Sequence, residues 1–155
     1  MRALVQRVNW ARVEAVHPQV GRVPARVTST GSIGVGLCVL VGVTHTDDEA
    51  TAERLASKVW HLRVFAGSDG VMGRSLAETS RSVLVVSQFT LYGDTRRGRR
   101  PSWVAAAPPE VAEPLVLRFC NTLVRLGATV ATGRFGSYMR LALENDGPVT
   151  LLLEL

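Results

Sequence analysis

Three polar side chains lie within four residues at the end of an apolar run near the middle of the chain. Residues 83–86 are apolar and mostly β-branched, which is typical of a short buried strand. Ser87, Gln88 and Thr90 then bring two hydroxyls and a carboxamide, with Phe89 between them. Buried polar groups are costly without a partner. The cluster is therefore either hydrogen-bonded locally or open to a ligand, and this segment alone favours the local interpretation.

A cationic loop follows this polar cluster. Gly93-Asp94 indicates a turn. Four arginines come next: Arg96, Arg97, Arg99 and Arg100. A polar strand end beside a cationic loop is suited to holding a phosphate-bearing substrate, although arginine clusters are more often simply a solvated surface.

The titratable residues argue against several kinds of catalysis. His17, His45 and His61 show no metal-ligand spacing with one another or with the cysteines, so we expect no metal site. A hydrolase triad with Ser87 or Thr90 as nucleophile needs a histidine base, and none of the three lies in a similar polar motif. Catalysis without them would rest on backbone donors, positioning and the substrate's own groups, with no cofactor.

Length and composition favour one globular domain spanning residues 1–155. The formal charge of +5, from 18 basic and 13 acidic residues, favours polyanionic partners such as nucleic acid. Cys38 and Cys120 lie in apolar surroundings and are typical of a reduced protein. The longest apolar run, 33–43, is shorter than the roughly 20 residues that span a bilayer. We therefore expect a cytoplasmic protein with no membrane partner.

Hydrophobic periodicity predicts seven or so strands and two helices, an α+β domain. A capping box at 46–49, with Thr46 as N-cap, starts the first helix. Pro108-Pro109 opens the second, since proline is tolerated in the first turn, and a start near Pro114 is the alternative. We expect a hairpin over 17–31 with a long irregular tip, and mostly loop over 71–82. Strands are expected at 3–8, 10–16, 34–43, 64–65, 83–91, 129–132, 138–143 and 149–153, with 10–16 either extending the strand 3–8 or pairing with it.

The segment 145–148, Asn-Asp-Gly-Pro, is expected to be a turn between the last two strands. Proline removes a ladder N–H and restricts the residue before it. Because only about 5% of X–Pro bonds in folded proteins are cis, composition alone favours a trans link between Gly147 and Pro148.

Taken together, residues 87–91 and 145–150 resemble the two signature motifs of the D-aminoacyl-tRNA deacylase family, also known as the D-tyrosyl-tRNA deacylase family. Each short motif is weak evidence alone, but both stand in order in a chain of suitable length. Supporting similarity runs through nearly the whole chain, at 6–8, 36–37, 94–96, 98–102 and 132–135.

The resemblance implies mainly antiparallel sheets forming a barrel-like core with two helices packed on it. It also implies a homodimer whose active site lies at the subunit interface. The substrate would be D-aminoacyl-tRNA, and also glycine misattached to tRNA, with free amino acid and tRNA as products. Four residues would line the pocket around the 3′-terminal adenosine and its ester: Ser87, Gln88, Phe89 and Thr90.

The same resemblance assigns chiral selection to a second element. Gly147-Pro148 would form a cis peptide that reaches into the partner's pocket. Its carbonyl oxygens would hold the amino group of the substrate and leave no room for an L side chain. Arg7 resembles the residue that helps to fix this element, and Met139 would border the adenine.

Catalysis in the family is RNA-assisted, with the terminal 2′-hydroxyl helping to activate water. Thr90 matches a residue once proposed as nucleophile, and backbone N–H groups near Phe89 and Thr90 would stabilise the oxyanion. The arginine loop would contact tRNA phosphates. The alternative function is a tRNA-binding module without catalysis.

The chain departs from the family pattern at three places. The hairpin at 17–29 is longer than usual, Tyr92-Gly93 stands where small residues are common, and Trp103 replaces a phenylalanine. None of these lies in the two motifs.

Overall fold

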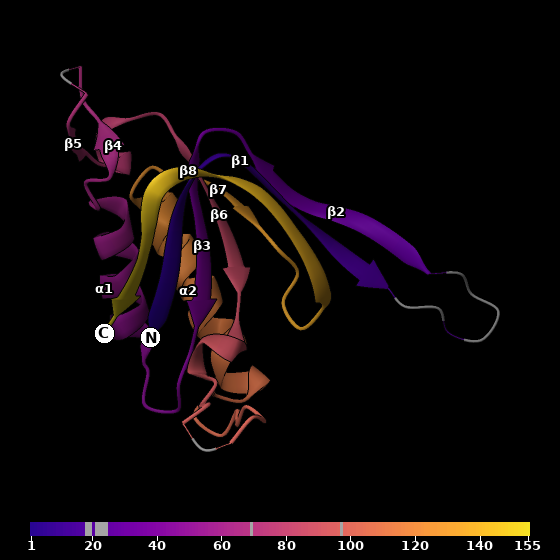
Figure 1. Cartoon of the computed structure of the whole chain (residues 1–155). Coiled ribbons are helices and arrows are strands. Elements are labelled where there is room, and N and C mark those ends of the chain that lie inside the picture. Colours follow the sequence, from indigo (N-terminus) through magenta and orange to yellow (C-terminus); the bar gives the residue numbers. More distant parts are fainter. Residues whose placement is uncertain (18–19, 21–24, 69, 97) are drawn as a thin grey trace.

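The computed structural model describes residues 1–17, 20, 25–68, 70–96 and 98–155 (Figure 1). Its strands are β1 (Arg2–His17), β2 (Arg26–Ile33), β3 (Gly36–Gly42), β4 (Phe65–Ala66), β5 (Met72–Arg74), β6 (Ser82–Ser87), β7 (Thr129–Thr132) and β8 (Tyr138–Glu154). Its helices are α1 (Glu49–Trp60) and α2 (Pro109–Arg125), with two 3₁₀ turns, η1 (Leu76–Glu78) and η2 (Phe89–Tyr92).

One large sheet organises these elements. Its strand order is β2-β1-β3-β6-β7, and β8 pairs with β1. The pairs that β1 makes are antiparallel, whereas β3–β6 and β6–β7 are parallel. The sheet curls until β2 approaches β7: a Cβ on Gly31 would lie 2.7 Å from the Thr132 carbonyl oxygen. The expected α+β class with a nearly closed, barrel-like sheet is confirmed.

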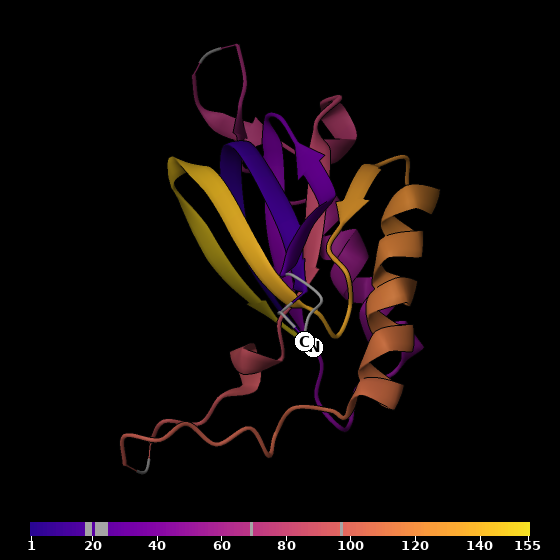
Figure 2. The same ribbon diagram turned by 90° about the vertical axis from the view of Figure 1, so that its right-hand side faces the viewer.

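The two helices cover one face of this sheet (Figures 1 and 2). β6 shows why its sequence is continuously apolar: Val83 and Val85 belong to the core beneath the helices, while Leu84 and Val86 belong to a second core on the opposite face. A strand buried on both faces loses the polar alternation of a half-exposed strand. The apolar run that ends at Ser87 is thus fixed from both sides.

The first strand is continuous, which is one of the two predicted outcomes, and the last strand is longer than predicted. The segments 3–8 and 10–16 form one strand, β1, and the expected strands 138–143 and 149–153 also form one strand, β8. The prediction of a hairpin turn at 145–148 is wrong. The chain instead passes along β1 with register shifts between Gln6 and Val8 and between Val8 and Trp10. Such irregularities absorb extra residues without reversing the strand.

The start of α1 differs from the expectation, whereas that of α2 agrees with the predicted opening at Pro108-Pro109. Asp48 caps α1, because its side chain accepts from the Thr51 N–H, so Thr46 is not the N-cap. α2 begins at Pro109 and contains Pro114. A proline so near the N-terminus removes only one early helical hydrogen bond, which packing of the apolar face outweighs.

The structure differs from the prediction in two further segments, and it describes a third only in part. Residues 71–82 are not mostly loop, since β5 and η1 lie there, and the predicted strand 83–91 ends at Ser87, where η2 takes over. The hairpin of β1 and β2 is present, but residues 18–19 and 21–24 of its expected tip lie outside the described residues. No helix in the described part of the chain is long and apolar enough to cross a membrane.

Candidate active site

The end of β6 opens onto the molecular surface. Ser87 pairs with Val41 of the parallel strand β3, and the Gln88 N–H donates to the Val41 carbonyl at 2.7 Å. The chain then leaves the sheet and turns through η2. This turn leaves Ser87 and Gln88 partly buried and brings Phe89 and Thr90 to the surface.

A pocket of about 780 Å³ begins at this strand end. It runs between β6, the start of α2 and the first residues of β8. Three of the four predicted motif residues, Ser87, Gln88 and Phe89, line it, and so does Met139 from β8. The remaining lining is mostly small or apolar: Val41, Val43, Val86, Trp103, Ala106, Ala107, Pro109, Ala112, Val116, Phe135, Gly136, Ser137, Tyr138 and Leu141.

Trp103 is a pocket residue that sequence analysis singled out only as a departure from the family. Its ring meets Phe89 edge to face, with centroids 5.5 Å apart and planes at 75°. Gly93 lies so close that a Cβ there would approach the indole to 2.5 Å. The aromatic residue and the glycine therefore form one packed unit behind η2, a pairing that their separation in sequence does not reveal.

Two of the polar side chains at this end bond to each other. The Gln88 carboxamide donates to the Thr90 hydroxyl. Two histidines are occupied elsewhere: His45 Nε2 lies 2.8 Å from the Val104 carbonyl oxygen, and His61 Nδ1 lies 2.9 Å from that of Ser57. Within the described residues, no group of three His, Cys, Asp or Glu is arranged to hold a metal ion.

Arg7 organises a second element at another place in the fold. Its guanidinium donates from Nη1 to the Val64 carbonyl at 2.5 Å and from Nη2 to the Gly147 carbonyl at 3.1 Å. Nε lies 2.7 Å from Asp146 Oδ2, an ion-pair contact without hydrogen-bond alignment. Arg7 is only 9% exposed. One cation thus joins β1, the segment before β4 and the middle of β8.

Asn145 completes this anchor. Its carboxamide donates to the carbonyl of Arg7 on β1 at 3.0 Å and to that of Val149, the residue after Gly147-Pro148, at 3.1 Å. The Gly147–Pro148 peptide is cis, so the trans geometry expected from composition is wrong. Gly147 and Pro148 are themselves exposed. Asn145 and Asp146 were predicted as turn residues and as part of the second motif, and they hold the neighbouring backbone in place.

The two predicted site elements do not meet within one chain. Gly147 lies beside Arg7, which pairs with Leu37, and Leu37 pairs in turn with Val83 at the start of β6. Ser87 stands at the other end of that strand. Strand rise and strand spacing place Gly147 and Ser87 roughly 20 Å apart across the sheet.

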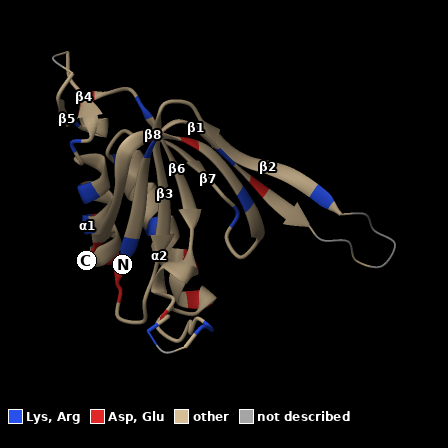
Figure 3. Cartoon of the chain, viewed as in Figure 1, with Lys and Arg blue, Asp and Glu red and all other residues tan. Residues whose placement is uncertain are grey.

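The predicted arginine loop extends from the body below η2 (Figures 2 and 3). Arg96 bonds the Asp94 carboxylate through Nε at 2.9 Å and Nη2 at 2.7 Å, and this contact lowers the Asp94 pKa to about 2. Arg99 and Arg100 are exposed and make no hydrogen bond or ion pair to another described residue. Arg97 lies outside the described residues.

Arg2 on β1 also contacts η2. It donates to the Leu91 carbonyl at 2.7 Å, and its guanidinium lies 4.5 Å from the centre of the Tyr92 ring. Burial, followed by the nearby Asp47 charge, raises the Tyr92 pKa to about 12. Tyr92 therefore stays a neutral packing residue at physiological pH, although its position departs from the family pattern.

Comparison with known proteins gives a consistent answer. The chain is 57% identical to the D-aminoacyl-tRNA deacylase of Nocardia farcinica over 154 residues, which is 99% of each chain. It is 52% identical to that of Mycolicibacterium smegmatis over 155 residues, the full length of both.

The fold comparison agrees. A solved structure named c-Myc DNA unwinding element binding protein superposes with a TM-score of 0.87 at 34% identity, covering 100% of this chain and 99% of the other. The family model described as D-Tyr-tRNA(Tyr) deacylase matches residues 4–154. On these matches, the chain belongs to the D-Tyr-tRNA(Tyr) deacylase family.

Proposed function

We propose that the protein is a hydrolase that cleaves the ester bond of D-aminoacyl-tRNA and releases free amino acid and tRNA. The single observation that carries the proposal is the match of residues 4–154 to a deacylase family. The open pocket at Ser87–Phe89 supports it, because an acylated nucleotide needs an accessible site of this kind. We extend the substrate range to glycine misattached to tRNA on the strength of the family resemblance.

Chiral selection in this proposal requires two chains. Gly147-Pro148 and the Ser87 pocket lie on separate parts of one protomer, so the element that screens the substrate must come from a partner in a homodimer. Exposure of Gly147 and Pro148 supports such a contact. The Gly147 carbonyl oxygen, held by Arg7, suits recognition of an amino group, and the anchored Gly147-Pro148 backbone excludes an L side chain sterically.

The chemistry in this proposal draws little on acid–base side chains. Histidines 45 and 61 bond backbone carbonyls, and the Thr90 hydroxyl is paired with Gln88. We therefore assign activation of water to the 2′-hydroxyl of the terminal ribose. The Phe89 and Thr90 N–H groups are assigned to the developing oxyanion, and Ser87, Gln88 and Met139 to binding of the terminal adenosine.

The arginine loop supplies sequence-independent affinity. Arg99 and Arg100 are exposed, and guanidinium groups bind phosphate oxygens well. We assign both to the tRNA backbone, with Arg96 and Arg97 as further members of the loop. Binding should weaken steeply with salt. Because the substrate takes part in translation, we also propose a cytoplasmic site of action.

The second candidate function is a nucleic-acid-binding module without catalysis. It has one specific point in its favour, because the structural neighbour at 34% identity carries the name of a DNA-binding protein. A second solved structure, named as a probable eukaryotic D-amino acid tRNA deacylase, is 18% identical with a TM-score of 0.78 and supports the shared fold alone.

One assay separates these functions. Purified protein is incubated with D-Tyr-tRNA and, in parallel, with L-Tyr-tRNA, and release of tyrosine is measured. We expect release from the D substrate only. Release from neither supports the binding module, and release from both refutes chiral exclusion.

Thr90→Ala should retain activity, and loss of essentially all turnover in this variant would instead favour Thr90 as a nucleophile.

A further inference from the structure

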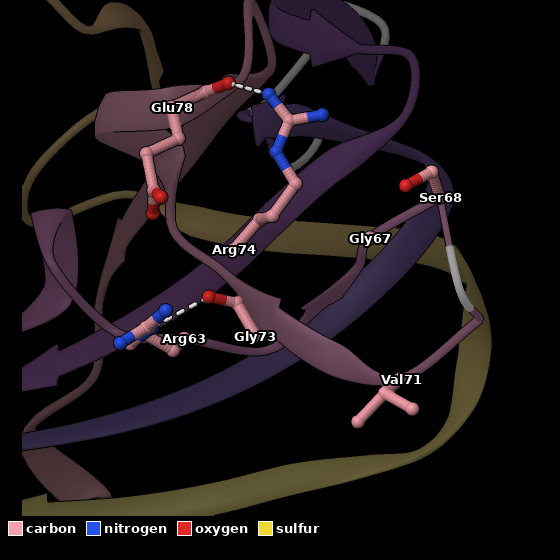
Figure 4. Close-up of a pocket in the computed structure, with 7 residues that line it drawn as sticks. All are labelled: Arg63, Gly67, Ser68, Val71, Gly73, Arg74 and Glu78. Atoms are coloured by element: carbon pink, nitrogen blue, oxygen red, sulfur yellow. Dashed lines mark hydrogen bonds between the residues drawn. The ribbon is translucent and has the colours of Figure 1, made fainter.

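A second, polar pocket lies beside β4, β5 and η1, and the proposed reaction does not use it. Its volume is about 510 Å³. Two exposed arginines, Arg63 and Arg74, line it together with Ser68 and the main chain of Gly67 and Gly73 (Figure 4). Cationic side chains around a polar hollow suit an anion better than an apolar ligand.

Main-chain contacts hold both guanidinium groups in this pocket. Arg63 Nε donates to the Gly73 carbonyl at 2.5 Å, and Arg74 Nη2 donates to the Glu78 carbonyl. One carbonyl takes only part of the five N–H groups that a guanidinium carries. The contacts therefore orient the side chains while leaving donor capacity for a further acceptor.

Glu78 does not pair with Arg74 through its carboxylate. Figure 4 shows that the carboxylate points away from the Arg74 guanidinium, which reaches the main-chain oxygen instead. Hydrogen bonds from the Ser75 hydroxyl at 2.7 Å and the Ser75 N–H at 2.8 Å occupy the carboxylate and lower the Glu78 pKa. Glu78 thus stabilises η1. Arg81, whose guanidinium lies 4.4 Å from the centre of the Phe65 ring, adds a further positive charge beside β4.

The place of this pocket in the fold decides which anion it meets. Val64 stands between Arg63 and β4, and Arg7 binds the carbonyls of both Val64 and Gly147. The polar pocket and the Gly147-Pro148 element therefore belong to one end of the molecule, opposite the end that holds Ser87. If Gly147-Pro148 enters the pocket of a partner chain, β4 and β5 come with it to the rim of that pocket.

We propose that Arg63 and Arg74 of one chain bind a backbone phosphate of the tRNA whose acylated end lies in the partner's pocket. This inference rests on the proposed function and extends its substrate-binding surface across the dimer. Guanidinium groups match phosphate oxygens through paired N–H donors, and the Ser68 hydroxyl supplies another donor. Contacts of this kind position an RNA without reading its sequence.

The first test separates the phosphate contact from the ester site. Charge reversal by Arg74→Glu should raise KM for D-Tyr-tRNA roughly tenfold and leave kcat unchanged. Turnover of D-tyrosyl-adenosine, which lacks the tRNA phosphates, should not change. For binding of deacylated tRNA, the slope of the logarithm of the binding constant against the logarithm of salt concentration should become shallower by about one, the contribution of one phosphate contact.

A matched control checks that total charge is not responsible. Arg118→Glu makes the same change of charge on α2, where Arg118 pairs with Glu49 at the opposite end of α1 from Arg63. It should leave KM for both substrates near the wild-type values. Thermal unfolding of both variants reports any loss of structure, and Arg74→Lys, which keeps the charge, should recover part of the affinity.

A mixed dimer tests whether the contact is made across subunits. One chain carries Arg74→Glu with an intact pocket, and the other carries intact Arg74 with a pocket inactivated by Gln88→Ala and Phe89→Ala. A wild-type KM supports the proposal, because the intact arginine then serves the other chain's pocket. A raised KM places Arg74 on its own chain's substrate and overturns it.

The remaining outcomes keep the two proposals distinct. A wild-type protein that releases no tyrosine from D-Tyr-tRNA overturns the proposed function and this inference together. Normal wild-type turnover with an unchanged KM in Arg74→Glu overturns this inference alone. Equal losses on D-Tyr-tRNA and D-tyrosyl-adenosine overturn it as well, because a phosphate contact cannot affect a substrate without those phosphates.

Discussion

The pocket at Ser87 and the anchor at Arg7 are built in opposite ways. The pocket is bounded by small and apolar side chains, and its polar groups make short-range contacts such as Gln88 to Thr90. Phe89 at its mouth is 56% exposed. Such a site is open to a ligand, and it depends on local packing for its shape.

The anchor depends instead on long-range contacts to the main chain. Arg7 bonds carbonyl groups 57 and 140 residues away in sequence, and Asn145 closes the same unit from the other side. A binding site must admit and release its ligand, whereas a steric screen works only if it cannot move aside. The contrast suits the proposed roles, in which the pocket receives the substrate and the Gly147-Pro148 element rejects its mirror image.

Loss of the Arg7 side chain should have the largest effect. Arg7→Ala leaves the Val64 and Gly147 carbonyls without their donor and Asp146 without its counter-ion. We expect a loss of about 3 kcal/mol in the free energy of unfolding. This value is at the lower end of the range for breaking a buried ion pair, because water reaches Asp146. Urea denaturation measures this loss, and discrimination between D- and L-Tyr-tRNA should fall with it.

Arg12→Ala is the matched control for this change. Arg12 lies on the same strand, is exposed and stacks only loosely, 6.0 Å from the centre of the Trp10 ring. Its removal should change stability by no more than about 0.5 kcal/mol. If Arg7→Ala is no less stable than Arg12→Ala, the Arg7 contacts are not what fixes the Gly147 segment.

A methyl group on Gly147 should affect function without affecting stability. The nearest atom to an added Cβ is Asn145 Oδ1, 3.9 Å away, so the protomer has room for it. If Gly147 enters the pocket of a partner chain as proposed, the same methyl group meets the substrate there. We therefore expect kcat/KM for D-Tyr-tRNA to fall at least tenfold in Gly147→Ala, about 1.4 kcal/mol of transition-state binding.

Gly34→Ala provides the comparison, because an added Cβ there meets nothing within 4 Å and Gly34 belongs to neither site element. Both variants should unfold at the wild-type urea concentration, and only Gly147→Ala should lose activity. Unchanged rates on both enantiomers in Gly147→Ala would remove this segment from the substrate site.

The sequence predicted local features better than it predicted where strands continue. Alternation and apolar runs identify β3 and β6 because one strand's own side chains carry that information. The continuity of β8 through Gly147-Pro148 depends on pairing with β1 and on the Arg7 and Asn145 contacts. Since those partners are far away in sequence, a local pattern predicted a turn instead.

Dependence on contacts between distant residues also explains why the place of Trp103 in the pocket was not predicted. The motif residues Ser87, Gln88 and Phe89 are adjacent, and the structure brings Met139 to them in one pocket. Trp103 reaches that pocket only because the 93–102 loop folds back, with hydrogen bonds between Asp94 and Ser102 in both directions. No periodicity reports such a loop closure, although an aromatic residue next to an arginine-rich segment was a usable hint.

Truncation of Trp103 should have a smaller effect, confined to the pocket. Trp103→Ala removes the edge-to-face contact with Phe89, worth about 1 kcal/mol. We expect KM for D-Tyr-tRNA to rise a few-fold, because Phe89 then loses its support. Trp10→Ala controls for loss of an indole, since Trp10 is 40% exposed and Trp103 42%. A similar KM in both variants would show that Phe89 does not need Trp103.

The Asp94–Arg96 pair should give the smallest effect, one best seen by titration. Hydrogen bonding to Arg96 lowers the Asp94 pKa from 3.8 to about 2, so the pair's contribution is complete above pH 4 and is lost as pH falls through about 2. Carboxyl NMR should record this pKa in the wild-type protein and a value closer to 3.8 in Arg96→Ala. Glu78 serves as an internal control, because Ser75 rather than Arg96 is the main cause of its lowered pKa. An unchanged Asp94 pKa in Arg96→Ala would mean that the ion pair does not persist in solution, and that Arg96 is as available to phosphate as Arg99 and Arg100.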